Sequence, residues 1–200
     1  MNNASYVIYA PLALCDITKP LYPKARYDEV LSYKNENLRQ EKYQVWKLLE
    51  KAVREYTSLD FDNIKFTKTA NGKWVCPDFY FSLSHTDGVI CVAVSSRPVG
   101  VDIERAVPLR ERFADKILTK DERIYYDTLG KEEGGEFLLD AWVKKESLFK
   151  MLGEESLLPS LRDTLSSPVT VQRISVKDNE YVLALAGESK KIIVRYTEET

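Results

Sequence analysis

The stretch "FYFSLSHTDGVICVAVSSRPVGVDIERA", residues 79–106, decides the fold of this chain. It holds three short runs of β-prone residues, at 79–83, 89–95 and 99–104. Turn-forming pairs separate these runs, namely Asp87-Gly88 and Arg97-Pro98. Short apolar runs bounded by turn residues are typical of β-strands. The middle of the chain is therefore expected to be a cluster of strands.

The residues before this cluster predict a strand, a long helix and a hairpin. "SYVIYAPLAL", residues 5–14, is typical of a buried first strand. A helix is predicted where apolar side chains recur every three to four positions, at Val45, Trp46, Leu49, Ala52, Val53 and Tyr56. Asn71-Gly72, flanked by β-prone residues, is a strong hairpin signal.

Two helices and three strands are expected after the cluster. "TKDERIYYDTLG" starts with Thr119 as a helix N-cap, and Glu122 three places later completes a capping-box pattern. "GEFLLDAWVKKESLFKMLG" predicts a second helix that ends at Gly153. From residue 169, "VTVQRISV", "YVLALA" and "KKIIVRYT" predict an antiparallel meander. The predicted fold class is α+β.

Composition limits the classes of protein that this chain can represent. Its 200 residues, 44% of them hydrophobic, can bury a sizeable core in one large domain or two small halves. The 29 basic and 31 acidic residues give a net charge of −2, which indicates neither nucleic acid binding nor a polybasic membrane anchor. Pro11 interrupts the first apolar run, so we expect a buried strand there and not a signal peptide.

The cysteines point to a reducing compartment. Cys15, Cys76 and Cys91 are odd in number, far apart in sequence and without CxxC spacing. This pattern predicts neither a disulfide framework nor a zinc site. We therefore expect reduced cysteines in a cytoplasmic protein.

Three carboxylates are candidates for a metal site. Asp102 and Glu104, at i and i+2 of an expected strand, would project from one face and repel each other unless a cation lay between them. Glu146 could add a third oxygen, and magnesium needs only a few protein carboxylates together with substrate phosphates. The alternatives are a solvated strand edge for Asp102 and Glu104, and an ordinary surface ion pair between Glu146 and Lys150.

Phosphate-binding groups are also present. His85, the only histidine, lies between Ser84 and Thr86 just after an expected strand. Short hydroxyl groups, a ring N–H and turn amides together suit a phosphate oxygen. Lys73, beside the Asn71-Gly72 turn, is a further candidate, with an exposed surface lysine as its alternative. Trp142 lies one turn before Glu146 and is expected to pack beneath this site.

Three motifs occur in the same order as in the surfactin-type 4′-phosphopantetheinyl transferases, which this chain resembles. They are "NGKWVCPDFYFSLSHT", "VGVDIE" and "WVKKESLFKMLG", and the resemblance extends from residue 71 to residue 153. The family transfers the phosphopantetheine arm of coenzyme A to a serine of an acyl or peptidyl carrier protein. The resemblance implies a magnesium-dependent enzyme that releases adenosine 3′,5′-bisphosphate.

The resemblance also implies roles for individual residues. The expected magnesium ligands are Asp102, Glu104 and Glu146. The expected coenzyme A contacts are Lys73, Ser84, His85, Lys145, Lys150 and, near the start of the long N-terminal helix, Lys42. Arg39 competes with Lys42 for the 3′-phosphate, and Lys24 and Arg26 are further candidates for the nucleotide. Glu122 matches an acidic position of the family, which its capping-box role explains equally well.

The family fold is a monomer of two similar α+β halves with the active site in the cleft between them. Here it implies halves at residues 1–100 and 101–200, and the short echo between "VICVAVSS" and "YVLALAGES" fits such a repeat. Glu146, directly or through a metal-bound water, is expected to receive the proton of the carrier serine, while Lys150 and His85 would neutralise charge on the phosphates. Two alternatives stay open: another magnesium-dependent phosphotransfer enzyme, and a non-catalytic module that binds coenzyme A or a carrier protein.

Overall fold

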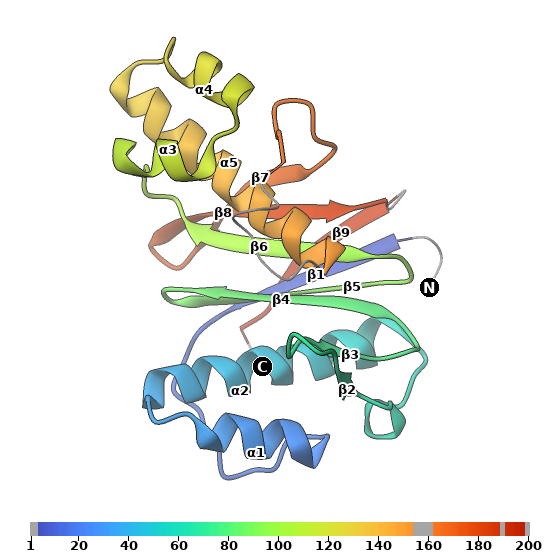
Figure 1. Ribbon diagram of the computed structural model, residues 1–200. Helices are drawn as coiled ribbons and strands as arrows, with labels where there is room; N and C mark the ends of the chain where they lie inside the picture. The colour runs from blue at the N-terminus through green and yellow to red at the C-terminus, as the bar shows by residue number, and fades with distance from the viewer. Residues whose placement is uncertain (1–3, 154–161, 189–190, 199–200) are drawn as a thin grey trace.

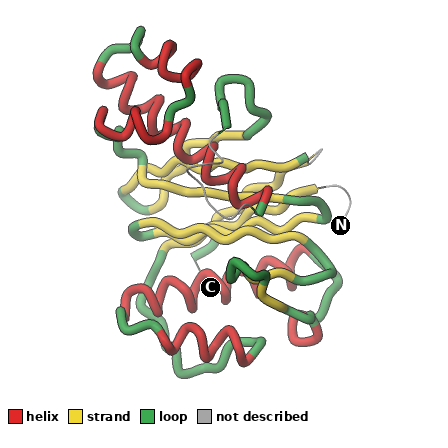
Figure 2. The backbone as a smooth tube through the Cα atoms, in the orientation of Figure 1, coloured by secondary structure: helices red, strands yellow, loops and turns green. Residues whose placement is uncertain are grey.

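The computed structural model describes residues 4–153, 162–188 and 191–198 of the chain (Figures 1 and 2). The N-terminal strand and helices are β1 (Ala4–Pro11), α1 (Lys24–Ser32) and α2 (Glu36–Tyr56). Five strands follow, which are β2 (Thr67–Lys68), β3 (Trp74–Val75), β4 (Tyr80–Thr86), β5 (Val89–Ser95) and β6 (Val99–Arg105). The remaining helices and strands are α3 (Ala114–Ile117), α4 (Lys120–Tyr126), α5 (Lys131–Leu152), β7 (Thr170–Val176), β8 (Asn179–Gly187) and β9 (Lys191–Tyr196). The mixture of helices and strands agrees with the predicted α+β class.

The strands form two main sheets with helices on their outer faces, as Figure 1 shows. One sheet has the order β4-β5-β1-β9 and the other the order β6-β8-β7. Helix α2 covers the first sheet, and α5 lies across β6 and β8 of the second. The strand cluster expected at residues 79–104 is thus confirmed as β4, β5 and β6, although β6 belongs to the second sheet.

Strand β5 is buried on both faces because it lies in the middle of these layers. Ile90, Val92 and Val94 join the core that α2 covers. Val89 and Cys91, on the alternate face, join the core between the two sheets. A strand covered on both sides reads as a continuous apolar run, which explains the sequence "VICVAV".

Side-chain hydrogen bonds connect the two sheets where β4 runs beside β6. The hydroxyl oxygen of Ser82 accepts a hydrogen bond from the Val101 backbone N–H at 3.0 Å. That of Ser84 accepts one from the Ile103 N–H at 3.3 Å. The serines therefore supply acceptors that a neighbouring strand backbone would otherwise provide.

The predicted C-terminal meander is wrong for its third strand. β7 and β8 are antiparallel neighbours, as expected, but β9 pairs in parallel with β1 of the other sheet. The reason is that β6 already occupies the second edge of β8, where Val99 lies opposite Gly187. β1 offers a free edge, and β9 fills it.

The ends of the helices follow the local sequence. Asn35 caps α2 by accepting a hydrogen bond from the Leu38 N–H, and Thr119 and Glu122 form the expected capping box on α4. Gly153 ends α5 in the left-handed conformation, with φ of 69°. Within the described residues, no helix is both long and apolar enough to cross a membrane. Cys15, Cys76 and Cys91 are free thiols.

Candidate active site

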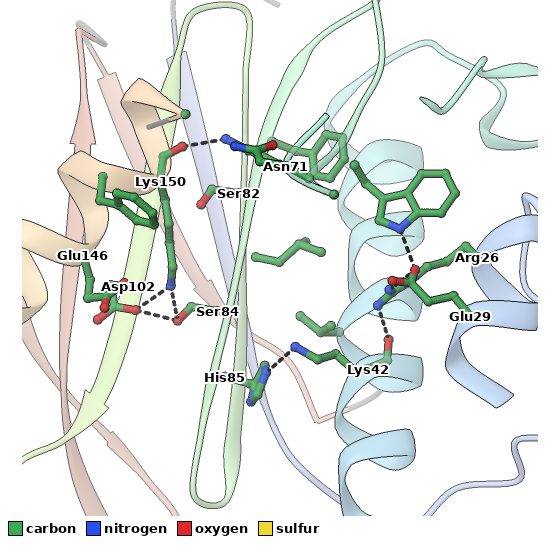
Figure 3. A pocket seen from close by; sticks show the side chains of 18 of the residues that line it. Arg26, Glu29, Lys42, Asn71, Ser82, Ser84, His85, Asp102, Glu146 and Lys150 are labelled. Carbon is green, nitrogen blue, oxygen red and sulfur yellow. Dashed lines mark hydrogen bonds and ion pairs between the residues drawn. The ribbon is translucent and has the colours of Figure 1, made fainter. Parts of the chain in front are cut away.

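A pocket of about 600 Å³ lies between α1, α2, the β2–β3 hairpin, β4, β6 and the C-terminal end of α5. Eight of the nine predicted site residues line it, as Figure 3 shows in part. These eight are Lys42, Lys73, Ser84, His85, Asp102, Glu104, Glu146 and Lys150. Residues from distant parts of the chain therefore meet in one hollow that is both cationic and acidic.

Gly100 allows α5 to reach the pocket. An added Cβ on Gly100 would lie 1.9 Å from the carbonyl oxygen of Ser147 and 2.6 Å from the Met151 backbone nitrogen. Only glycine therefore lets β6 and α5 pack this closely. The close packing brings Lys150, in the last turn of α5, onto Asp102 of β6.

Lys150, Asp102 and Ser84 form the polar centre of the pocket (Figure 3). The Lys150 ammonium lies 2.6 Å from Asp102 Oδ1 and 3.0 Å from the Ser84 hydroxyl oxygen. Ser84 donates its own hydrogen bond to Asp102 Oδ1 at 2.8 Å. Asp102 is only 4% exposed, and its second oxygen, Oδ2, has no hydrogen-bond partner among the described residues. A buried carboxylate oxygen without a partner is costly and is available to a ligand.

The two glutamates beside Asp102 are held in an environment that disfavours their charge. Glu104 accepts hydrogen bonds from the Thr86 hydroxyl at 3.0 Å and the Trp142 indole N–H at 3.4 Å. Burial, followed by the charge of Asp102, raises the pKa of Glu104. Burial and Asp102 also raise the pKa of Glu146. The three carboxylates thus repel one another, as the sequence predicted for Asp102 and Glu104.

The three carboxylates are the residues predicted to bind magnesium. Among the described residues, no group of three or more His, Cys, Asp or Glu side chains is arranged as a ready metal centre. The chemistry of these side chains nevertheless suits a divalent cation. Asp102 has a buried oxygen without a partner among the described residues, and it lies beside Glu104 and Glu146, two carboxyl groups whose pKa values are raised. The three carboxylates therefore fit a magnesium ion by their chemical type. In this structure the Lys150 ammonium supplies the positive charge next to Asp102.

His85 is neutral in this pocket. Burial, followed by the charges of Lys42 and Lys150, lowers the pKa of His85 to about 4. Its Nε2 lies 3.0 Å from the Lys42 ammonium, which can only donate, so we assign the ring proton to Nδ1. Nδ1 lies 3.2 Å from a carboxylate oxygen of Glu41. Glu41, adjacent to Lys42 on α2, was not predicted as a neighbour of this ring.

The β2–β3 hairpin brings Lys73 to the pocket. The turn depends on Gly72, whose φ of 82° favours glycine. The Lys73 ammonium donates to the carbonyl oxygen of Lys150 at 2.6 Å, at the end of α5. Burial and the charge of Lys150 lower the pKa of Lys73. An ammonium in such surroundings gains strongly from an anionic ligand.

The N-terminal basic candidates differ in position. Lys42 lines the pocket, whereas Arg39 is not among the residues that line it. Arg26 is 4% exposed and also lines the pocket, and its guanidinium donates to the Lys42 carbonyl oxygen at 3.1 Å. Lys24 is exposed and pairs with Asp28 at 2.6 Å, outside the pocket.

Of the nine residues expected to bind magnesium or coenzyme A, Lys145 is the one that does not line the pocket. Its ammonium is buried and lies 2.7 Å from Glu122 Oε2, in a pair whose side chains are 1% and 0% exposed. Glu122 also accepts from the Thr164 N–H at 2.8 Å and from the Thr164 hydroxyl at 2.6 Å. Glu122 therefore both caps α4 and joins it to α5, which gives the acidic position a structural role.

Comparisons with known proteins identify the family of this chain. Residues 98–197, half of the chain, match the profile of the 4′-phosphopantetheinyl transferase superfamily. The chain belongs to this family.

Three relatives from bacilli carry the same enzyme name. The chain is 29% identical over 113 residues to 4′-phosphopantetheinyl transferase gsp of Aneurinibacillus migulanus, and the alignment covers 56% of the chain and 48% of that protein. It is 31% identical over 117 residues to Sfp of Bacillus subtilis, covering 56% and 51%, and 32% identical over 112 residues to psf-1 of Bacillus pumilus, covering 54% and 47%. The chain thus spans about half the length of the relatives it matches.

Proposed function

We propose that this protein is a 4′-phosphopantetheinyl transferase that moves the phosphopantetheine arm of coenzyme A onto a serine of an acyl or peptidyl carrier protein. Adenosine 3′,5′-bisphosphate is the second product. The observation that carries the proposal is the meeting of Lys42, Lys73 and Lys150 with three carboxylates in one pocket. Family membership and the names of its relatives support the same reaction.

The cationic part of the pocket binds the phosphates of coenzyme A in this proposal. Lys42, Lys73 and Lys150 supply positive charge, and Ser84 and His85 supply hydrogen bonds. Burial lowers the pKa of Lys42 and of Lys73, so a phosphate would restore the interactions that their ammonium groups lose on leaving water. An anionic phosphate beside His85 would likewise raise the pKa of this ring and favour its cationic form.

The acidic part of the pocket carries the chemistry. Asp102, Glu104 and Glu146 are the proposed ligands of Mg²⁺, which would supply charge stabilisation at the reacting pyrophosphate. Glu146 accepts the hydroxyl proton of the carrier serine as the serine oxygen attacks the phosphorus atom that bears pantetheine. Lys150 stabilises negative charge on the phosphate and on the departing bisphosphate.

The finer architecture belongs to the same proposal. The pocket is lined by α2 and β4 from residues 1–100, and by Asp102 and Glu104 of β6 and the end of α5 from residues 101–200, which fits an active site in a cleft between two similar halves. Parallel pairing of β9 with β1 means that strands cross between these halves. We propose a monomer that works in the cytoplasm, and light scattering of the purified protein tests the first of these points.

Intact-mass spectrometry of an apo carrier protein tests the function. The carrier is incubated with the protein, coenzyme A and Mg²⁺, and the expected result is a mass increase of one phosphopantetheine group on the serine. An unmodified carrier together with nucleotide or phosphoester breakdown would point to another magnesium-dependent phosphotransfer enzyme. Binding of coenzyme A without any turnover would point to a non-catalytic module.

A further inference from the structure

We propose that Glu29 is a positioning residue. It holds in place the cationic wall of the pocket, formed by Arg26, Lys42 and Lys73, and thereby sets the affinity for the phosphate-rich end of the substrate. The inference rests on the proposed function for its substrate. It concerns the part of the pocket remote from Asp102, where α1 meets the β2–β3 hairpin. Figure 3 shows Glu29 beside Arg26 in this wall.

Three donors from two separate segments converge on the Glu29 carboxylate. Its Oε2 accepts from Arg26 of the same helix at 2.8 Å and from the Trp74 indole N–H at 2.7 Å. Its Oε1 accepts from the Lys68 ammonium at 2.8 Å. Lys68 and Trp74 are paired residues on the two strands of the hairpin. One carboxylate therefore holds both strands of the hairpin against α1.

The same contacts determine where three pocket groups lie. The hairpin turn carries Lys73 into the pocket, and Trp74 follows it directly. Arg26, held by Glu29 on one side, donates to the Lys42 carbonyl oxygen on the other. Glu29 thus connects the positions of the hairpin, of Arg26 and of α2 without reaching the reacting carboxylates.

Charge balance gives Glu29 a second reason to be present. Arg26 is 4% exposed, and its charge helps to lower the pKa of Lys42 after burial itself. Burial alone would raise the pKa of Glu29, but hydrogen bonds from Lys68, Trp74 and Arg26 outweigh it and lower the pKa to about 2. Glu29 is therefore ionised throughout the working pH range. Its negative charge offsets the mutual repulsion of the cationic side chains in this part of the pocket.

The substitution Glu29→Gln tests this role. Glutamine keeps the length of the side chain but replaces one acceptor oxygen with an NH₂ donor, which then faces Trp74, Arg26 or Lys68. We expect the hairpin and Arg26 to shift, and the KM for coenzyme A to rise about tenfold while kcat stays within about twofold of wild type. Affinity for adenosine 3′,5′-bisphosphate, measured by calorimetry, should fall by a similar factor.

Asp28→Asn is the matched control. Asp28 precedes Glu29 on α1, loses the same charge and pairs only with the exposed Lys24 among the described residues. Its kinetics and bisphosphate affinity should stay at wild-type values. Trp74→Phe, which keeps an aromatic ring but removes the indole N–H, should reproduce part of the Glu29→Gln effect.

The outcomes distinguish a positioning role of Glu29 from a role in folding stability alone, and from failure of the proposed reaction. A loss of folded protein lowers apparent kcat and leaves KM unchanged, so that pattern in Glu29→Gln, or no change at all, overturns the inference. If wild type binds the bisphosphate without modifying a carrier, and Glu29→Gln binds it about tenfold more weakly, the inference stands while the proposed function fails. If wild type does not bind the bisphosphate, both fail.

Discussion

Glu146→Gln separates catalysis from stability in this protein. Glu146 projects from α5 into the pocket and is half-buried. Burial and the charge of Asp102 raise its pKa, so the folded protein disfavours its ionised form. Glutamine keeps the shape and a similar helix propensity, but it removes the charge and the capacity to accept a proton.

The two expected magnitudes differ widely. Removing a carboxylate that its surroundings disfavour should change the free energy of unfolding by no more than about 0.5 kcal/mol. For a chain of this size that corresponds to a shift in Tm within about 2 °C. Loss of a general base lowers turnover by about 10²–10⁴-fold, and a weakened metal site adds to that loss.

The assay measures carrier modification by intact mass and thermal unfolding on the same preparation. Glu136→Gln provides the control, because Glu136 lies on the same helix and is exposed outside the pocket. It should behave as wild type in both measurements. Near-normal transfer by Glu146→Gln would refute both the base role and the metal-ligand role of Glu146.

Three further predictions follow from the pocket and the α4–α5 contact. Carrier modification should stop in excess chelator and return when Mg²⁺ is added. Because the pKa values of Glu104 and Glu146 are raised, the affinity of the site for Mn²⁺ should fall as the pH is lowered from 7 to 5. A Mn²⁺ affinity that calorimetry finds independent of pH would contradict this site. Lys73→Ala should weaken binding of coenzyme A more than binding of dephospho or truncated analogues, whereas an equal loss for all analogues would indicate a folding defect. Lys145→Met leaves the buried Glu122 carboxylate without its cation, which should lower the free energy of unfolding by about 3–5 kcal/mol and the Tm by roughly 10 °C. In a calorimetric scan, the double variant with Glu122→Gln should recover part of this loss in Tm.

Local sequence predicted the secondary structure well because each signal acts over a few residues. The Asn71-Gly72 turn, the Thr119–Glu122 capping box and the Gly153 stop depend only on neighbouring backbone groups. The pairing of β9 could not be predicted in this way. Which edge a strand joins depends on which edges other strands have already filled, and β6 fills the edge of β8 that a meander would have used.

The pocket was predictable where a motif carried several of its groups together. "VGVDIE" supplies both Asp102 and Glu104, and strand periodicity places them on one face with Ile103 on the other, where it joins the core. Glu29 and Glu41 were missed because their partners are distant in sequence: Glu29 meets Trp74 and Lys68 of the hairpin, and Glu41 meets His85. The i,i+3 spacing of Arg26 and Glu29 was the one local signal for the first of these contacts.

Helix geometry distinguishes Lys145 and Lys150, which belong to the same motif of α5. Lys150 follows Glu146 by four residues, so both side chains lie on one face of α5, and both line the pocket. Lys145 directly precedes Glu146, and adjacent helical residues point about 100° apart, so its ammonium leaves that face and reaches Glu122 on α4. Lys150 therefore supplies charge to the pocket, while Lys145 anchors the helix that presents Glu146 to it.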